Sequence, residues 1–448
     1  MREPIHILGG GLAGSEAAWQ AARRGARVVL HEMRPRKKTA AHQTGGLAEL
    51  VCSNSLKSEQ EFTAPWLLKE ELRRCDSLLL GAAEKARVPG GHALSVDRER
   101  FSAEVTAAIA GEPAIVVLRE EVTAIPRNGV VVVATGPLTS EALAGEIAQA
   151  TGADRLYFYD SISPIVDADT VDTSVAFWAS RYDKSASGTN DYLNCPFDRE
   201  QYERFVDALL EAREATAHIA EDKTPFFEAC LPIEELARRG RETLRFGPMK
   251  PMGLVDPRTG KRPWAVVQLR QESLRGGSFN LVGFQNHLQF GDQARILRLI
   301  PGLENAEFPR FGQMHRNTYI NAPALLTPAL QLRTRPEALF AGQISGVEGY
   351  VEAIATGLMA GMHAGVLAAG GTPRALPFET ALGSLCRYIS GADPAHYQPA
   401  NITFDLLPPL DEETHNRLRR DKKARHAEVC RRALDALDRY RAEEAARV

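Results

Sequence analysis

The chain has few of the features that would place it outside the cell or in a membrane. Its 448 residues include six cysteines, and none of these has the CxxC spacing of a zinc site or a disulfide framework, so free thiols are expected. No apolar run has membrane-spanning length, and Met1 stands too close to the first predicted strand to leave room for a signal peptide. We therefore expect a cytoplasmic protein, with no membrane partner and no metal site.

A strong excess of one charge is also lacking, because the formal net charge is −3. A composition of 44% hydrophobic and 25% charged residues is typical of a soluble chain with two or three domains. The distribution is less even: residues 417–432 carry eight basic and two acidic side chains. Such a stripe either binds phosphates or is a solvated helix face, and Arg419, Lys422 and Lys423 are the candidate phosphate contacts.

The N-terminal segment has the pattern of a dinucleotide-binding site. An apolar strand at residues 5–8 leads into the turn Gly9-Gly10-Gly11-Leu12-Ala13-Gly14. The glycines allow a tight turn and close approach of a pyrophosphate, and the amides at the start of the next helix face the anion. A helix at 15–24 and a strand at 26–30 follow, and Glu32 comes after that strand, where a carboxylate binds ribose hydroxyls. A glycine turn without a ligand is the alternative, and this context disfavours it.

The same motif binds NAD or FAD, so later segments must decide between them. A strand at 130–133 runs into Gly136, at a position where two-part flavin enzymes often return to the nucleotide. A second strand at 338–341 runs into Gly342, Gln343 and Gly346, and this segment resembles the late flavin-binding element of glutathione-reductase-like proteins. Those proteins usually have an acidic residue where this chain has Gln343.

A small-residue helix is predicted over 349–364, with Gly357, Gly361 and Gly365 spaced by four residues. No strand precedes these glycines, so we interpret them as a site of close helix packing. No second complete dinucleotide motif is present.

The flavin elements lie at both ends of the chain, which favours an insertion between them. We predict an α/β chain with a glutathione-reductase-like FAD-binding Rossmann fold and an inserted α+β subdomain. The FAD-binding domain would comprise residues 1–160 and 315–448, and the insertion residues 161–314. Within the insertion the pattern predicts helices over 199–221 and 231–239 and strands over 264–269 and 278–283. A long charged segment is expected over 411–446.

Two cysteines have informative surroundings. Cys52 lies in the polar stretch 49–58, one loop beyond the second strand and so near the edge where a flavin ring would lie. Cys230 lies in Phe226-Phe227-Glu228-Ala229-Cys230-Leu231-Pro232. A free cysteine is more often buried and inert than reactive, and location favours chemistry only at Cys52.

Several of these segments together resemble one family, TrmFO, the folate- and FAD-dependent tRNA (uracil-5-)-methyltransferases. The resemblance rests on the opening glycine turn, on Val51 to Ser58, on Phe226 to Pro232, on Val282 to Leu288 and on Gly342 to Tyr350, which follow family order over nearly the whole chain. The Gly-Gln-Ile element is shared with the wobble-uridine flavoprotein MnmG or GidA. That relative is typically longer, with an additional C-terminal domain for which this chain has little room.

The resemblance implies a reaction and a set of roles. It implies methylation of carbon 5 of uridine 54 in a tRNA T loop, with 5,10-methylenetetrahydrofolate as carbon donor and FADH2, regenerated by NAD(P)H, as reductant. Cys230 resembles the family position proposed to attack carbon 6 of the base. Cys52 resembles the second family cysteine, acting as acid or base or stabilising a one-carbon intermediate. His287 and His315 are candidates to contact the folate, although a structural histidine is the more common case.

Two other enzymatic functions and one non-enzymatic function stay open from the sequence. A flavoprotein fold also permits MnmG-like wobble-uridine modification or NAD(P)H-dependent oxidoreduction of a small molecule. A flavin-containing tRNA-binding or chaperone protein is a further alternative, and methyl transfer from folate would exclude it. No protein partner is evident from the sequence.

Overall fold

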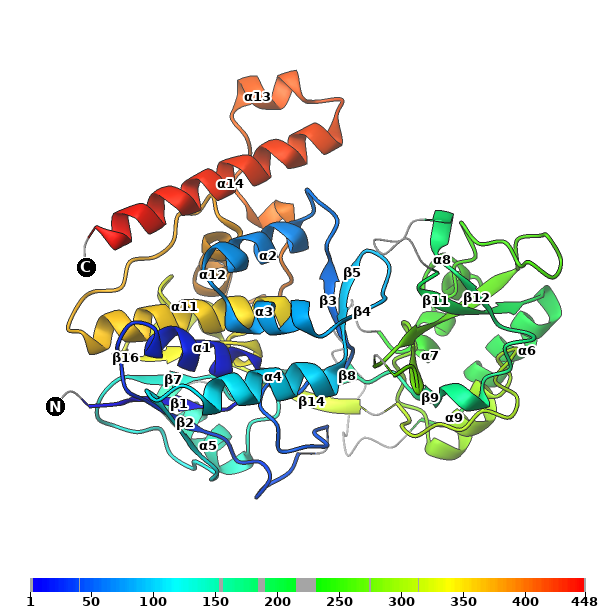
Figure 1. The fold of residues 1–448 in the computed structure, drawn as a ribbon, viewed down its shortest axis with the longest axis horizontal. Helices are drawn as coiled ribbons and strands as arrows, with labels where there is room; N and C mark the ends of the chain where they lie inside the picture. Colours follow the sequence, from blue (N-terminus) through cyan, green and yellow to red (C-terminus); the bar gives the residue numbers. More distant parts are fainter. Residues whose placement is uncertain are drawn as a thin grey trace.

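Two sheets organise the chain and lie in different parts of the molecule (Figure 1). The computed structural model describes residues 3–39, 41–152, 156–183, 190–214, 231–273, 275–312 and 314–446. We call residues 3–152 and 319–446 the parallel-sheet unit and residues 165–312 the insertion unit. Each unit has a hydrophobic core of its own, formed by residues 5–147 and 319–440 in the first and by residues 166–306 in the second.

A six-stranded sheet forms the centre of the parallel-sheet unit. Its order is β15-β16-β7-β1-β2-β6, and every pair is parallel except β15 with β16. Its strands are β1 Ile5–Leu8, β2 Val28–His31, β6 Ile115–Leu118, β7 Val131–Val133, β15 Gln331–Leu332 and β16 Arg335–Phe340. The inner strands are apolar runs because helices cover both faces of such a sheet. The predicted α/β fold class is confirmed.

Helices surround this sheet and extend beyond it. They are α1 Leu12–Ala22, α2 Ala64–Arg74, α3 Leu78–Lys85, α4 Arg98–Ala110, α5 Glu141–Thr151, α10 Ala322–Leu325, α11 Tyr350–Ala368, α12 Ala381–Gly391, α13 Glu412–Arg417 and α14 Lys422–Ala445. Figure 1 shows α13 and α14 rising above the rest of the unit. The charged segment expected over 411–446 is therefore two helices joined by a turn.

The four-residue glycine spacing brings α11 against α1. A Cβ on Gly357 would lie 2.3 Å from the backbone oxygen of Ala13, and a Cβ on Gly361 would lie 2.4 Å from that of Ala17. A Cβ on Gly365 would instead meet the side chain of Arg24 at 3.0 Å. The predicted close helix packing is confirmed, and it fixes the helix that begins at the glycine turn.

Helix α11 corrects one expectation from the sequence. Within the described ranges it alone has the length and mean hydropathy of a membrane-crossing helix, at 19 residues and 1.4, although no such run was expected. Of its apolar window, 78% is buried inside the fold. Its apolar side chains therefore form part of the hydrophobic core between the sheet and α12.

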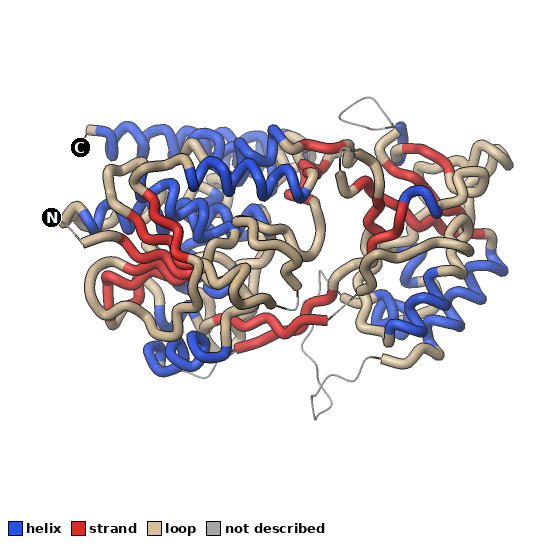
Figure 2. The backbone as a smooth tube through the Cα atoms, turned by 60° about the horizontal axis from the view of Figure 1, so that its bottom comes forward, coloured by secondary structure: helices blue, strands red, loops and turns tan. Residues whose placement is uncertain are grey.

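Two small sheets stand apart from the two large ones. β3 Ser55–Ser58, β5 Ala93–Val96 and β4 Arg87–Val88 form an antiparallel sheet in the order β3-β5-β4. β8 Leu156–Ser161 and β14 Met314–Tyr319 form an antiparallel ribbon where the chain passes from one unit to the other (Figure 2). The boundaries predicted at residues 160 and 315 fall within this ribbon, and we propose the same division into two domains.

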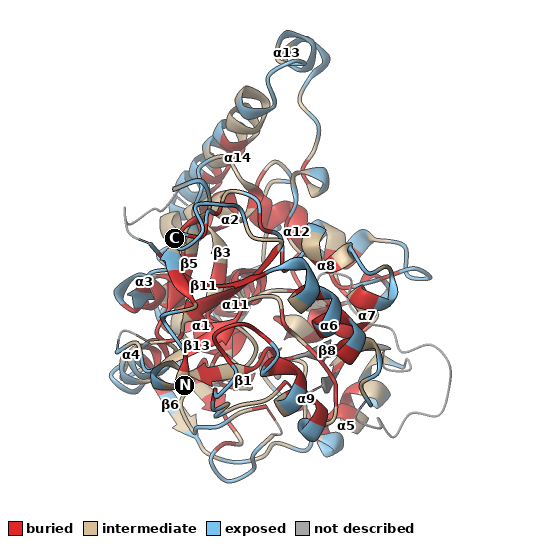
Figure 3. Cartoon of the chain, turned by 90° about the vertical axis from the view of Figure 1, so that its right-hand side faces the viewer, coloured by how far each residue is buried: buried red, intermediate tan, exposed pale blue. Residues whose placement is uncertain are grey.

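The insertion unit combines an antiparallel sheet with short helices. Its sheet has the order β10-β11-β12-β13-β9. The strands are β9 Ile165–Asp167, β10 Phe177–Ala179, β11 Tyr192–Phe197, β12 Ala265–Gln271 and β13 Ser278–Leu281, and the helices are α6 Arg199–Leu210, α7 Ile233–Arg238, α8 Thr243–Phe246 and α9 Phe290–Leu297. Figure 3 shows its buried strands beside the more exposed α6 and α8.

The helix predicted over 199–221 is too long. α6 ends at Leu210, and residues 211–214 leave the helix before the described range stops. The start of α6 follows local chemistry, because Asp198 and Gln201 form a reciprocal capping box. The two predicted strands, by contrast, agree with β12 and β13 to within two residues.

Candidate active site

A cavity of about 430 Å³ lies at the carboxyl ends of β1, β2, β7 and β16. Its lining joins segments from both ends of the chain and, through Ile162 and Gln285, from the insertion. The predicted site residues that line it are Gly9, Gly11, Leu12, Ala13, Glu32, Cys52, Gly136, Gly342 and Gln343. An open α/β sheet binds ligands at this edge, so the fold and the motifs indicate the same place.

The N-terminal glycines divide into a binding surface and a packing contact. A Cβ on Gly11 would meet no described atom within 4 Å, so its backbone is open to a ligand. A Cβ on Gly14 would lie 1.7 Å from the carbonyl oxygen of Gly9, and Gly9 itself has φ +102°. Gly10 packs against Leu47 and does not line the cavity. Because α1 begins at Leu12, its first amides lack intrahelical acceptors at the point where the cavity opens.

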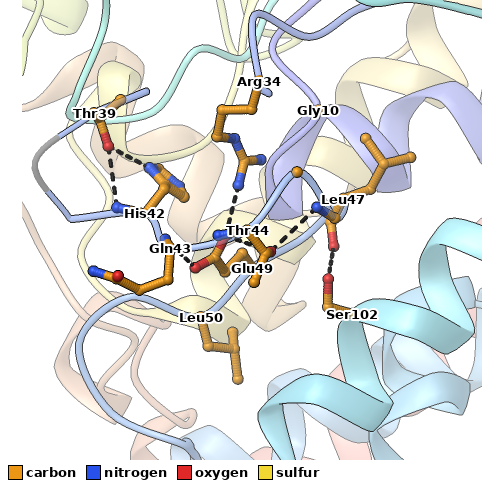
Figure 4. A network of polar contacts seen from close by, with 12 residues as sticks. Gly10, Arg34, Thr39, His42, Gln43, Thr44, Leu47, Glu49, Leu50 and Ser102 are labelled. Carbon is orange, nitrogen blue, oxygen red and sulfur yellow. Dashed lines mark hydrogen bonds and ion pairs between the residues drawn. The ribbon is translucent and has the colours of Figure 1, made fainter. Parts of the chain in front are cut away.

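Glu32 is held by groups of the protein itself. Its carboxylate accepts hydrogen bonds from the Gly10 amide at 2.9 Å and from the Arg34 Nε at 2.9 Å. Burial raises the pKa of this carboxyl, but the hydrogen bonds and charge of Arg34 outweigh burial and hold the pKa below its ordinary value. Arg34 also donates to Glu49, which accepts from the Thr44 hydroxyl at 2.8 Å (Figure 4). Glu32 therefore braces the loop that follows β2, and its contact with ribose stays a prediction.

The second glycine element, residues 342–346, has some residues that line the cavity and one that packs in the core. Gly342 has φ +78° and lies against Ala13 of α1, where a Cβ would approach Ala13 Cβ to 2.7 Å. Gln343 lines the cavity and donates to the Glu348 carboxylate at 2.7 Å. Gly346 packs against Tyr397, whose hydroxyl would be 2.2 Å from a Cβ there, and does not line the cavity.

Gly136, by contrast with Gly346, is open to the cavity. Its φ is +66°, and a Cβ there would meet no described atom within 4 Å. The turn after β7 can therefore approach a ligand as closely as Gly11 does.

The backbone around Cys52 is fixed from three sides. Arg98 donates to the carbonyls of Leu50 and Cys52, at 3.0 and 3.1 Å. Tyr350 accepts from the Cys52 amide at 2.7 Å, through its hydroxyl. Arg310 of the insertion unit donates to the Val51 carbonyl. The thiol is therefore presented to the cavity by a loop that both units hold.

The other described cysteines are unsuited to chemistry. All five described cysteines are free thiols, as expected, and Cys52 is the one that lines the cavity. Burial raises the pKa of Cys75, Cys386 and Cys430 to about 12 and raises that of Cys195 further, so these thiols stay protonated. Cys230 lies outside the described residues.

Lys57 lines the cavity, although no motif in the sequence assigned a role to its side chain. Its ammonium donates to the buried Glu352 at 2.6 Å and to Asn401 at 2.5 Å. Its φ is +61°, a strained conformation for a residue with a Cβ. Lys69 holds this conformation, because its buried ammonium binds the carbonyls of Leu56, Lys57 and Ser58 at 2.8–3.0 Å. The polar run 51–58 was a signal for Lys57, whereas nothing in the local sequence distinguishes Lys69.

None of the predicted substrate contacts with a described side chain lines the cavity. His287 is buried in the insertion unit, with its Nε2 3.1 Å from Glu214 and its Nδ1 2.7 Å from Glu234. Burial alone would lower the pKa of His287, but the two carboxylates raise it above its ordinary value. His315 lies in β14, and its side chain is outside the described part. Arg419, Lys422 and Lys423 are exposed at the junction of α13 and α14.

One group around His287 has the spacing of metal ligands. Ligand atoms of Glu214, Glu235 and His287 lie within 4.8 Å of one another. Arg238 forms ion pairs with both of these glutamates. A guanidinium thus already supplies the positive charge at this position, and the expected absence of a metal site stays a prediction.

The parallel sheet, the open glycine cradle and the second glycine element over one cavity define a flavoprotein of the FAD-binding Rossmann class. The fold is similar to that of GidA from Aquifex aeolicus in two crystal forms, with TM-scores of 0.67 and 0.69 at 18% and 17% identity. These matches cover 99% and 97% of this chain and 76% and 78% of the GidA chains.

Sequence comparison is more specific. Residues 4–372 match the family described as Glucose inhibited division protein A. The chain is 74% identical over 441 residues to methylenetetrahydrofolate–tRNA-(uracil-5-)-methyltransferase TrmFO of Solibacter usitatus, covering 98% of this chain and 99% of the relative. It is 63% identical to the TrmFO of Koribacter versatilis, covering 98% of each. The chain belongs to the TrmFO family.

Proposed function

We propose that this protein methylates carbon 5 of uridine 54 in the T loop of tRNA. 5,10-Methylenetetrahydrofolate supplies the carbon, FADH2 the electrons, and NAD(P)H regenerates the reduced flavin. The observation that carries the proposal is 74% identity to a TrmFO over nearly the whole chain, together with a cysteine on the wall of the nucleotide cavity. A cytoplasmic location follows from the substrates, and no protein partner is required.

The reaction has two chemical requirements. Carbon 5 of uracil is a poor nucleophile, and a thiolate that adds to carbon 6 moves electron density onto carbon 5. We assign this attack to Cys230. The folate carbon is at the oxidation level of formaldehyde, so forming a methyl group requires two further electrons, and reduced FAD supplies them when bound.

The residues at the cavity fit FAD. Gly11 and Gly136 leave open space where a side chain would stand, and the first amides of α1 favour a pyrophosphate. Gly342 and Gln343 also line the cavity. Lys57 also lines the cavity, where its ammonium is held by Glu352 and Asn401. These residues bind and orient the cofactor at the carboxyl edge of the sheet.

Cys52 is placed to transfer a proton or to stabilise charge beside the flavin. Arg98 donates to the Cys52 carbonyl and Arg310 to the Val51 carbonyl, and each adds positive charge near the thiol. Because the Tyr350 hydroxyl accepts a hydrogen bond from the Cys52 amide, the backbone that carries the thiol is held in place at the cavity.

Two contacts with the substrates complete the proposal. Arg419, Lys422 and Lys423 bind tRNA phosphates and His315 contacts the folate, whereas both ring nitrogens of His287 already face carboxylates. The nicotinamide uses the same face of the flavin as the folate, one after the other. A ternary complex that holds both at once would contradict this order.

The deciding experiment supplies unmodified tRNA, methylenetetrahydrofolate and NADH to the purified yellow protein, with S-adenosylmethionine as the alternative methyl donor. We expect 5-methyluridine with folate alone. Rapid NADH oxidation without product from either donor would favour a general flavin oxidoreductase, and modification of the wobble uridine would favour MnmG-like chemistry.

Variants of the two cysteines separate their roles. Cys230→Ala should retain FAD and NADH oxidation and lose methyl transfer, whereas loss of flavin would indicate a structural role. Cys75→Ala is a matched control, because Cys75 is half-buried outside the cavity and burial raises the pKa of its thiol to about 12. Equal methylation by Cys52→Ala and Cys75→Ala would contradict a catalytic role for Cys52.

A further inference from the structure

An exposed apolar surface on the insertion unit lies outside the cavity. Ten large apolar side chains are exposed in the described part of the chain, and four of these gather in two segments of the insertion unit. We call this the α8 surface; its apolar members are Tyr182, Phe246, Met252 and Val255. Phe246, at the end of α8, is 79% exposed. Single exposed apolar side chains are ordinary on a protein surface, whereas apolar side chains that cluster and are rimmed by polar residues mark a binding surface.

Tyr182 and the loop after α8 are in direct contact although some 70 residues separate them. The Tyr182 amide donates to the Gly253 carbonyl at 2.8 Å. A Cβ on Gly253 would lie 2.8 Å from the Tyr182 ring, so the ring covers this glycine. Arg181 donates to the carbonyls of Met252, at 3.0 Å, and of Lys250. The Tyr182 ring and the loop after α8 therefore lie side by side at the surface.

Positive charge accompanies the apolar side chains. Arg181, Lys250, Lys261 and Arg262 lie in the same two segments, and among the ion pairs of the described residues none joins them to an acid. The acids in the loop are already paired, Glu242 with Arg245 and Asp256 with Arg258. The α8 surface thus combines unpaired cations with exposed rings.

The sheet of the insertion unit connects this surface to the Cys52 loop. Ala179 at the end of β10 pairs with Tyr192 of β11, and Tyr192 pairs with Arg270 of β12. Arg270 donates to the Asn54 side chain at 2.8 Å, two residues beyond Cys52. Two strand spacings, about 10 Å, therefore separate the strand that leads to Tyr182 from the strand that contacts the Cys52 loop.

We propose that the α8 surface binds the unpaired loop of the tRNA substrate and directs it toward the cavity. This inference rests on the proposed function. Unpaired bases of RNA stack on exposed aromatic rings while arginine and lysine bind the adjoining phosphates. Protein interfaces are instead depleted in lysine. In Figure 1, α8 lies on the upper side of the insertion unit, the side on which α13 and α14 rise from the other unit, so one tRNA can contact both.

The test measures the affinity of the full-length, FAD-loaded protein for unmodified tRNA at several salt concentrations. The double variant Lys250→Ala, Lys261→Ala should weaken binding about tenfold and reduce the slope of log affinity against log salt by about 1.5. Phe246→Ala should also weaken binding about tenfold, with the slope unchanged, because it removes stacking and not charge. Retained FAD shows that each variant is folded.

Matched controls come from the same unit. Arg204 is an exposed cation of α6 and Phe290 is a 55% exposed ring of α9, and both lie outside the α8 surface. Arg204→Ala and Phe290→Ala should leave tRNA affinity and the salt slope unchanged. Effects equal to those of the α8 variants would overturn the inference.

Three further outcomes have distinct meanings. If the wild-type protein binds tRNA and methylates it while the α8 variants behave like wild type, this inference alone fails. If the wild-type protein does not bind tRNA, the proposed function fails with it. If Phe246→Ala changes the oligomeric state and leaves tRNA affinity intact, the surface binds a second copy of the chain and the inference is overturned.

Discussion

The close approach of α11 to α1 makes a quantitative prediction for Gly361→Ala. The new Cβ would lie 2.7 Å from the Ala17 Cα, and ordinary carbon–carbon contact is about 3.5–4.0 Å, so one helix must move by about 1 Å. Overpacking of this kind costs about 1–3 kcal/mol. The substitution also gains about 1 kcal/mol in helix propensity, which partly offsets that cost.

Gly145 supplies the matched control. It lies within α5, where a Cβ would meet no described atom within 4 Å. Gly145→Ala gains the same propensity without the clash, and should stabilise the protein by up to about 1 kcal/mol. The difference between the two variants therefore isolates the packing cost, about 1–3 kcal/mol.

The assay is urea unfolding of the FAD-free protein, followed by circular dichroism, with FAD titration of the folded variants. Because α1 begins at the glycine cradle, its displacement by Gly361→Ala should also weaken FAD binding about tenfold, or about 1.4 kcal/mol. Equal unfolding midpoints and equal FAD affinities for Gly361→Ala and Gly145→Ala would refute the close packing of these helices.

Three further predictions concern buried polar groups. Burial lowers the pKa of His363 to about 4, whereas a histidine in the unfolded chain has a pKa near 6.5 and is therefore protonated first as the pH falls. The free energy of unfolding should consequently decrease by up to about 3 kcal/mol between pH 6.5 and 4. His363→Gln should flatten this pH dependence in urea midpoints measured across the same range. The Glu71 carboxyl group accepts hydrogen bonds from the amides of Ala381 and Leu382 at the start of α12, at 2.7 and 2.8 Å. Glu71→Ala should therefore destabilise the protein by about 2–4 kcal/mol in thermal unfolding, and an unchanged melting temperature would contradict this capping role. Lys57→Met should weaken FAD binding at least about tenfold in fluorescence titration, because it removes a cationic donor from the cavity wall and leaves the buried Glu352 carboxylate without its partner, and wild-type affinity would remove Lys57 from the cofactor site.

The sequence by itself determined the class of fold and the location of the cofactor cradle. Strand, turn and helix are encoded by neighbouring residues, and the requirement for glycine at Gly9 and Gly14 is a property of the local backbone. The spacing of Gly357 and Gly361 likewise specified a helix face before its partner was known. Family order of several motifs then identified the reaction to be tested.

Tertiary structure alone decided which of these residues face the cavity. Gly346 belongs to a motif yet packs on Tyr397, and Glu32 is engaged by Arg34. The contacts of Cys52 with Tyr350, 298 residues away, and of Lys57 with Glu352, 295 residues away, depend on chain segments that local patterns cannot bring together. Side-chain direction and burial arise when distant elements pack, and for that reason the environment of the thiol could not be read from the sequence.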